Sequence, residues 1–407
     1  MNEALLVHVE ALAREIGPRG TGTKAAAQAA HYVREQLQKL GLAANEQRFL
    51  AVGDMNWFPI SAALLALCGT MIYPWVGWTR WLGALLAGLA AVLLWWAITR
   101  ADSPLWCLLP RVRSRNVVAC IAPTGKTTQI VVVVSHLDSN RCRLAWRAGK
   151  TKTVKYGSIA TLAVYSANGL LYFLGAATGW HWPYLASFLD AFYILATLIV
   201  LLAEMRRPYS PGANDNAASV AVNLRLAARL AIEPLEKTEV FLAFTGAEEV
   251  DHRGLKVLLR EHAELREATF LVLEGVGGGE LCYLTKEGLI KHYRPDPGLL
   301  KLVEEMAKRR PDLNVKSGVM PMVDEVQTLR RLGYRAICLA GRDPQTDSLP
   351  YWHTCEDTVE HVSAVALGRA AGFVWEMLQE IDRQCRKEPC NLTKGVEAYL
   401  DGTQFLV

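Results

Sequence analysis

The sequence predicts an α/β protein built as three layers, α/β/α, around a mostly parallel mixed sheet, together with four transmembrane helices. Short apolar runs rich in branched residues, typical of buried strands, occur at positions 116–121, 130–134, 240–244, 269–273 and 335–339. Helical stretches lie between several of them, at 217–231, 254–264, 298–308 and 364–381. Apolar strands that alternate with helices indicate a sheet covered on both faces. The third observation is a pair of long uncharged segments.

The first helix of the layered part is predicted at 25–40. Its residues Ala29, Val33, Leu37 and Leu40 share one face of a helix, and Gly41 supplies the end. The amino terminus, MNEALLVHVEALAREIG, carries acids and lacks a continuous apolar core. We therefore expect it to begin a helix rather than to act as a signal peptide.

The two uncharged segments predict membrane hairpins. Positions 57–79 contain no Asp, Glu, Lys or Arg, Arg80 follows, and positions 81–99 are again uncharged. A second stretch runs from Tyr156 to Ala203 with only Asp190 interrupting it. Because a span needs about 20 apolar residues, each segment fits two helices, with turns near 73–80 and 179–183. Most of the tryptophans lie near the segment ends, where amphipathic rings favour the membrane interface.

Asp190 lies inside the fourth predicted span. An ionisable residue at such a depth is a candidate functional residue. The interpretation that we favour is a structural hydrogen bond to Asn168, which lies at a similar depth on the neighbouring span.

The hairpins, at 57–99 and 156–203, divide the chain into five segments. Residues 1–56, 100–155 and 204–407 all emerge on one side of the membrane and are expected to form a single domain there. Twelve basic residues flank the hairpins on that side, whereas the turns carry only Arg80 and His181. The positive-inside rule then predicts an integral, multi-pass protein with four spans in a lipid bilayer and this domain in the cytoplasm.

Charge and cysteine content exclude some classes of function. The 44 basic and 40 acidic residues nearly balance, and no basic stripe is interleaved with aromatic residues, so nucleic acid is not expected as a partner. The nine cysteines are odd in number and form no C-x-x-C pair, which predicts free thiols in a reducing compartment. A bridge between Cys385 and Cys390 stays open. No protein partner is indicated.

Candidate metal ligands follow the predicted strands. Each lies just beyond a strand or in a loop that leads into a helix, where loops of an open α/β sheet converge on ligands. Two imidazoles with several carboxylates are a ligand set that suits Zn²⁺. Their settings are VVVVSHLDS, PGANDNAAS, FTGAEEV, FLVLEG and YWHTCEDT, which offer His136, Asp215, Glu248 with Glu249, Glu274 and His353.

Two further positions suit catalytic support. The carboxylate of Asp138, two residues after His136, could accept the other ring N–H of a metal-bound histidine and fix its tautomer. The adjacent Glu248 and Glu249 could divide the work, with one binding metal while the other takes a proton from water. Two metals close together lower the pKa of a shared water and polarise a carbonyl group.

Taken together, these motifs resemble metallopeptidase family 28, the co-catalytic zinc aminopeptidases, which also include glutamate carboxypeptidases and glutaminyl cyclases. The similarity runs from IGPRGTGTKAAAQAAHYVREQLQKLGL to beyond HTCEDTVEHV. The resemblance implies the three-layer zinc-peptidase fold and two Zn²⁺ per chain. It implies that Asp215 bridges the metals and that Glu248 is the general base. It also implies an orienting role for Asp138 and the remaining metal ligands His136, Glu249, Glu274 and His353.

The function that follows from the resemblance is a membrane-anchored, zinc-dependent exopeptidase, an aminopeptidase, that hydrolyses peptide substrates with metal-activated water. The alternative is a catalytically inert peptidase-like scaffold or receptor module. The sequence departs from the family pattern in three places. Glu274 stands where Asp is common, Val323-Asp324-Glu325 replaces Ser-Asp-His, and the second hairpin separates His136 from Asp215. The last departure predicts an active site that opens close to the bilayer.

Overall fold

An eight-stranded mixed sheet forms the centre of the computed structural model, which describes residues 3–74, 77–99 and 104–384. The order across the sheet is β1-β2-β4-β3-β5-β8-β6-β7. Strands β4, β3, β5 and β8 run parallel to one another. The strands are β1 (Ala44–Val52), β2 (Arg111–Ile121), β3 (Gln129–His136), β4 (Thr238–Thr245), β5 (Thr269–Glu274), β6 (Glu280–Glu287), β7 (Lys316–Met320) and β8 (Arg335–Arg342).

Helices cover both faces of this sheet, so the predicted three-layer α/β fold is confirmed. One face packs against α1 (Glu3–Glu10), α2 (Lys24–Lys39), α7 (Ser219–Ile232), α9 (Pro297–Arg309) and α11 (Ala364–Gln384). The other packs against α8 (Arg253–Glu261) and α10 (Glu325–Arg331). The branched run at 131–134 in β3 is fully buried because both faces are covered. We call these strands and helices the sheet domain.

All five strands predicted from apolar runs are present, and the sequence analysis missed β1, β6 and β7. Strand β1 is at one edge of the sheet and pairs only with β2, so only some of its side chains are buried. Strand β6 carries charged residues near both ends, and β7 is a five-residue edge strand. Edge strands lack the continuous apolar run by which the central strands were recognised.

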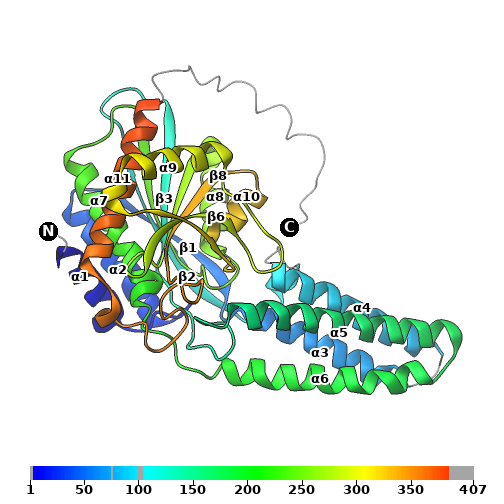
Figure 1. Cartoon of the computed structure of the whole chain (residues 1–407). Helices are drawn as coiled ribbons and strands as arrows, with labels where there is room; N and C mark the ends of the chain where they lie inside the picture. The colour runs from blue at the N-terminus through cyan, green and yellow to red at the C-terminus, as the bar shows by residue number, and fades with distance from the viewer. Residues whose placement is uncertain (1–2, 75–76, 100–103, 385–407) are drawn as a thin grey trace.

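The two uncharged segments form a four-helix bundle that projects from one side of the sheet domain (Figure 1). Its members are α3 (Trp57–Ile72), α4 (Trp78–Thr99), α5 (Thr151–Thr178) and α6 (Trp182–Glu204). Glycines allow the backbones to approach closely: an added Cβ at Gly69 would lie 2.8 Å from the carbonyl oxygen of Gly83, and one at Gly169 would lie 3.2 Å from the Cα of Gly88. Small residues at crossings are typical of membrane helix pairs.

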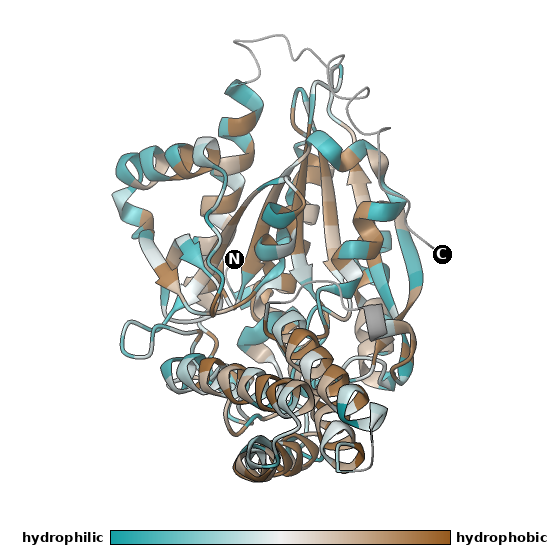
Figure 2. Ribbon diagram, turned by 90° about the vertical axis from the view of Figure 1, so that its right-hand side faces the viewer, coloured by the Kyte–Doolittle hydropathy of each residue, from teal (hydrophilic) through white to brown (hydrophobic). Residues whose placement is uncertain are grey.

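Three of these helices, α4, α5 and α6, are long and apolar enough to cross a membrane. Helix α3 has 16 residues, fewer than the roughly 20 that a span requires, so the fourth predicted span remains a prediction. Large apolar side chains cover the outside of the bundle, where Figure 2 shows mostly hydrophobic ribbon. Examples are Leu189 at 80% and Phe192 at 74% exposed. The predicted hydrogen bond between Asp190 and Asn168 is wrong, because the buried Asn168 amide has no hydrogen-bond partner.

Polar contacts fix the base of the bundle to the sheet domain. The Gln327 amide of α10 donates to the carbonyl of Thr99 at the end of α4, at 2.6 Å. The Glu204 carboxylate at the end of α6 accepts from the backbone N–H groups of Leu144 and Ala145, at 3.0 and 3.1 Å. The loop at 141–146, between β3 and α5, is therefore held against the bundle.

Candidate active site

Three adjacent parallel strands deliver four of the predicted site residues to one edge of the sheet. His136 is the last residue of β3 and Glu274 the last of β5, while Glu248 and Glu249 follow shortly after β4. Carboxyl ends of parallel strands lie at the same edge, so these side chains converge. All four are buried, with exposures of 1 to 8%.

Asp215 lies between the two predicted histidines. One carboxylate oxygen, Oδ1, is 3.2 Å from Nε2 of His136, and the other, Oδ2, is 3.5 Å from Nε2 of His353. Glu274 Oε1 lies 3.3 Å from the same His136 nitrogen, and Glu249 Oε2 lies 3.5 Å from the His353 nitrogen. The five predicted ligands therefore form two adjacent groups that share Asp215.

The turn that carries Asp215 is held from outside the predicted set. Asp357 accepts hydrogen bonds from the backbone N–H groups of Asn214 and Asp215, at 2.7 and 3.0 Å. The Arg19 side chain is 1% exposed and donates to the carbonyls of Leu137 and Gly212, at 2.9 and 2.6 Å. Arg19 thus ties the loop after β3 to the turn before α7.

Two asparagines position the glutamates. The Asn140 amide donates to Glu249 Oε2 at 2.7 Å, and the Asn216 amide donates to Glu274 Oε2 at 2.6 Å. Asn216 also accepts from the backbone N–H of Gly275, which fixes it to the end of β5. Each amide occupies one lone pair of a carboxylate and leaves the other oxygen directed elsewhere.

Asp138 supports His136 in a different way from the one predicted. The Nδ1 atom of His136 is 2.9 Å from the backbone carbonyl of Asp138, whereas the nearest carboxylate oxygen is 3.7 Å away. The Asp138 carboxylate instead accepts from the hydroxyl of Thr21, at 2.6 Å, and from the backbone N–H of Glu248, at 3.1 Å. The backbone carbonyl of Asp138 therefore sets the tautomer of His136.

Glu248 has a neighbour that the sequence analysis missed. Its Oε1 atom is 3.2 Å from Nε2 of His252, one helical turn later, and its Oε2 atom is 3.9 Å from Nε2 of His136. The other ring nitrogen of His252 is 2.8 Å from the hydroxyl of Thr328 in α10. The spacing of four residues in EEVDH was the available signal, because it would place both side chains on one helical face.

Buried negative charge dominates the electrostatics of the site. Burial raises the pKa of Glu248 well above its usual value and raises the pKa of Glu274 to about 8, and neighbouring carboxylates add to both effects. Burial acts to lower the pKa of His136, but Glu274 and Asp215 raise it well above the usual value. Buried charges are paired or bound to metals, so carboxylates packed this closely suit a bound cation.

The residues present fit zinc. Nε2 of His136 and Oδ1 of Asp215 are both buried and have no hydrogen-bond partner, although they face each other. Buried polar atoms without a partner are rare unless a bound group completes them. Imidazole nitrogen and carboxylate oxygen atoms are the ligands that Zn²⁺ takes in proteins.

Val323-Asp324-Glu325, one of the three departures from the family pattern, also lies beside the site. The Asp324 carboxylate accepts from the backbone N–H of Val326 at the start of α10, at 2.7 Å. Glu325 is buried, which raises its pKa to about 7. Glu287 and Cys338 lie close to Asp324, so a second group of acids continues behind Glu274.

Aromatic and aliphatic side chains close over the site. The space beside the ligands is only about 10 Å³ and is lined by Trp146, Met322, Val323 and Trp352 in addition to ligand residues. The rings of Trp146 and Trp352 are in edge contact, with centroids 6.1 Å apart. The Trp146 carbonyl also accepts from Nδ1 of His353, at 2.9 Å. A substrate must displace part of this cover to reach the ligands.

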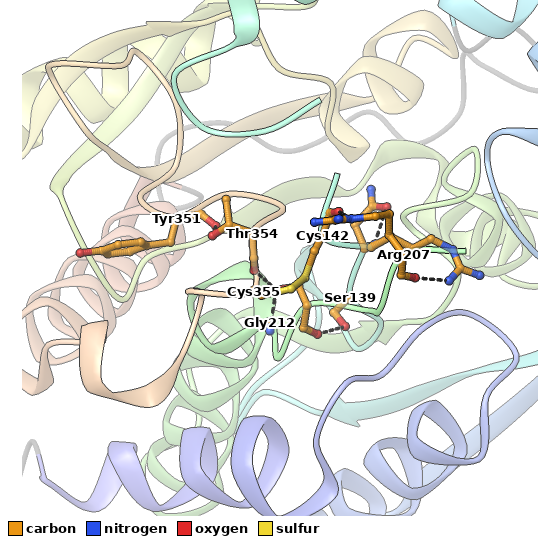
Figure 3. The surroundings of a disulfide bond; sticks show 10 residues. Ser139, Cys142, Arg207, Gly212, Tyr351, Thr354 and Cys355 are labelled. Carbon is orange, nitrogen blue, oxygen red and sulfur yellow. Dashed lines mark hydrogen bonds between the residues drawn. A yellow bond between two sulfur atoms is a disulfide. The ribbon is translucent and has the colours of Figure 1, made fainter. Parts of the chain in front are cut away.

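A disulfide joins Cys142 to Cys355, so the prediction of free thiols is wrong for these two residues (Figure 3). It connects the loop after β3 to the loop that carries His353. Ser210 reinforces the same junction, since its hydroxyl donates to the carbonyl of Thr354 at 2.8 Å. Cys68, Cys120, Cys282 and Cys338 are free thiols, and Cys385 and Cys390 lie outside the residues that the structure describes. Sequence spacing gave no signal for this pair, which is 213 positions apart.

Comparisons with known proteins agree with this fold. The family model described as Peptidase family M28 matches residues 187–378, a range that contains Asp215, Glu248, Glu249, Glu274 and His353. Aminopeptidase YwaD of Bacillus subtilis (strain 168) is 27% identical over 206 residues, which are 47% of this chain and 42% of that protein. The alignment thus spans less than half of that curated relative.

Solved structures share the fold over nearly the whole chain. BSAP, a zinc aminopeptidase from Bacillus subtilis, has a TM-score of 0.56 at 16% identity and covers 94% of this chain and 95% of its own. A Zn-dependent exopeptidase from Parabacteroides distasonis has a TM-score of 0.55 at 14% identity and covers 93% and 98%. A glutaminyl cyclase from Bacteroides thetaiotaomicron has a TM-score of 0.55 at 14% sequence identity. The match covers 92% of this chain and 96% of the cyclase chain.

The class that these features define is the fold shared by zinc-dependent exopeptidases and glutaminyl cyclases. Within it, the chain is similar to peptidase family M28 over residues 187–378, in line with the sequence motifs. His136 and Asp138 precede the matched range, so their assignment rests on the site geometry alone.

Proposed function

We propose that the protein is a membrane-anchored, zinc-dependent exopeptidase, and specifically an aminopeptidase. The observation that carries the proposal is the position of Asp215, whose two oxygens face two different buried imidazoles at 3.2 and 3.5 Å. A carboxylate so placed serves two cations at once. The names of the relatives, a zinc aminopeptidase and a Zn-dependent exopeptidase, support the same activity.

Each ligand has a place in this proposal. His136 and Glu274 would hold one zinc ion, His353 and Glu249 would hold the other, and Asp215, which faces both histidines, would serve both ions. Asn216 restricts Glu274 by donating to Oε2, the oxygen other than the one that faces His136. Asn140 restricts Glu249 by donating to Oε2, the same oxygen that faces His353. When bound, the pair of zinc ions polarises a substrate carbonyl and makes water more acidic.

Glu248 acts as the general base. Its Oε2 atom lies 3.9 Å from Nε2 of His136, and burial raises the pKa of its carboxyl well above the usual value. A carboxylate with a raised pKa accepts a proton from water more readily and then returns it to the leaving amine. His252, 3.2 Å away and held by Thr328, keeps the side chain in place.

Membrane anchoring is part of the proposal. Helices α4, α5 and α6 meet the length and composition of spans, and their outward surfaces expose large apolar side chains. In water such a surface would be an association site, whereas in a bilayer it is solvated.

The cytoplasmic placement of the sheet domain rests on basic residues of which two, Arg141 and Arg143, pair with the buried Asp54. The disulfide is typical of an oxidising compartment and supports the opposite side.

Mass spectrometry of a mixed peptide pool tests the activity. Detergent-purified protein with zinc is compared with the Glu248→Gln variant. Stepwise loss of amino-terminal residues with the unsubstituted protein, but not with Glu248→Gln, supports an aminopeptidase. Loss of residues from the carboxyl terminus would indicate a carboxypeptidase instead. Loss of ammonia from peptides that begin with glutamine would indicate a cyclase, as in the glutaminyl cyclase of similar fold. An unchanged pool with zinc bound would favour the inert scaffold.

A further inference from the structure

An apolar cavity of about 360 Å³ lies where the helix bundle joins the sheet domain. Each of the four bundle helices contributes to its wall near the end that meets the sheet domain. Phe58 comes from the start of α3, Leu94 from the last part of α4, Val154 from the start of α5 and Leu201 from the end of α6. The two insertions therefore build the cavity.

The cavity adjoins the metal ligands at two places. Trp146 lines both the cavity and the small space over the ligands, and its carbonyl accepts from His353. Met55 lines the cavity and contacts the Asn140 amide, which donates to Glu249. A ligand in the cavity is thus separated from the site by one layer of side chains.

One polar group in the wall is available to a ligand. Arg143 is 3% exposed, and its Nε and Nη2 atoms donate to Asn140 and Asp54. Its Nη1 atom is buried and has no hydrogen-bond partner, with Glu204 Oε2 at 3.8 Å. A buried N–H donor that lacks a hydrogen-bond partner is stabilised when a bound ligand supplies an acceptor.

The charged residues that line the cavity determine which kind of ligand group can accept a hydrogen bond from Arg143. Glu204 and Asp251 also line the cavity, and Lys256 pairs with Asp251 at 2.7 Å, so Glu204 is the carboxylate that would repel an anionic group such as a phosphate. A neutral carbonyl oxygen accepts from Arg143 without that cost. A peptide offers such carbonyls together with apolar side chains, whereas a phospholipid carries its ester carbonyls together with an anionic phosphate.

We propose that this cavity is a substrate subsite for hydrophobic peptides. The amino terminus lies at the metal ligands, the apolar residues beyond the scissile bond fill the cavity, and one of their carbonyls accepts from Arg143 Nη1. The substrate class would then be apolar peptides that reach the site along the bilayer surface. This inference rests on the proposed exopeptidase function.

Two peptides and two variants of the full chain test the subsite. The peptides share an amino-terminal leucine–glycine bond and differ beyond it, with three leucines in one and three serines in the other. Gly157→Leu adds a side chain to the cavity wall, at a position where an added Cβ meets nothing within 4 Å. Gly88→Leu in α4 is the matched control, since a Cβ there also meets nothing within 4 Å and Gly88 does not line the cavity.

We expect the unsubstituted protein to favour the leucine peptide by about tenfold or more in kcat/KM, the effect of burying one leucine-sized side chain. Gly157→Leu should lower this preference severalfold, and Gly88→Leu should keep it. Equal kcat/KM for the two peptides, or the same preference in both variants, would overturn the subsite. The subsite would also be overturned if native mass spectrometry showed a phospholipid bound to the unsubstituted protein and lost in Gly157→Leu, while the preference for the leucine peptide stayed unchanged.

Failure of the exopeptidase proposal looks different, because no peptide is then cleaved although zinc is bound. A binding measurement still decides the subsite in that case. A fluorescent form of the leucine peptide should bind the Glu248→Gln variant, and adding Gly157→Leu should weaken that binding while adding Gly88→Leu should not. Equal binding to both double variants would remove the subsite.

Discussion

The carboxylate of Asp138 accepts a hydrogen bond from the backbone N–H of Glu248, at 3.1 Å. The backbone carbonyl of Asp138 is at the same time 2.9 Å from Nδ1 of His136. A single residue therefore fixes both the tautomer of one proposed zinc ligand and the backbone position of the proposed base. This arrangement holds the backbone of Glu248 so that its side chain lies next to the proposed ligand His136.

Glu248→Gln should lower kcat by about 10²- to 10⁴-fold, because glutamine cannot take the proton from water. Its size and the Asp138 contact are preserved, so zinc content should not change. Steady-state kinetics with a leucine–glycine peptide and metal analysis of the same sample measure both effects. Glu261→Gln, an exposed position on α8, is the control and should leave kcat unchanged. Full activity of Glu248→Gln would remove Glu248 from the mechanism.

Asp54 should make the base of the bundle sensitive to acid. Burial acts to raise the pKa of Asp54, but Arg143, the backbone N–H of Asn56 and Arg141 together lower it below the usual value. An acid whose pKa is lowered in the folded state stabilises that state above the unfolded pKa of about 3.9. This contribution is lost as the pH falls through the lower, folded pKa.

The measurement compares Tm of the unsubstituted protein and Asp54→Asn between pH 3 and pH 7. Asp54→Asn should have the lower Tm at neutral pH, and the difference should shrink as the pH falls below about 4. A difference in Tm that stays constant over this range would show that the ionised Asp54 carboxylate does not stabilise the fold.

The disulfide should stabilise the loop that carries His353. Removal of a native disulfide costs about 2–5 kcal/mol in small secreted domains, and a lower value is expected here because Ser210 and Arg207 hold the same loops by hydrogen bonds. The double variant Cys142→Ser, Cys355→Ser should therefore unfold at a lower temperature and bind zinc more weakly. Thermal unfolding with and without zinc tests this, with Cys120→Ser, a free exposed cysteine, as control. Equal Tm for both variants would contradict a stabilising role.

The central strands and their ligands were predictable from the sequence because they combine two strong signals. Continuous branched runs identify strands covered on both faces, and a polar residue that ends such a run lies at the edge where ligands bind. His136 and Glu274 satisfy both conditions as the last residues of β3 and β5. The edge strand β1 has only partial burial, and it was missed for that reason.

The supporting residues could not be predicted from local patterns, because each acts through a contact between segments far apart in the chain. Arg19 reaches the turn at Gly212, and Asp357 reaches Asn214 and Asp215. The pairing of Cys142 with Cys355 has the same character. A single sequence reports which residues are suited to a site, and the fold decides which distant residues hold them there.

Zinc content of the purified full chain tests the central claim most directly. Metal analysis after dialysis against trace zinc should give two zinc ions per chain for the unsubstituted protein. His353→Ala should give about one, because His136, Glu274 and Asp215 remain, and its peptidase activity should fall with the second ion. One zinc ion or none in the unsubstituted protein, or full activity in His353→Ala, would contradict a two-zinc site bridged by Asp215.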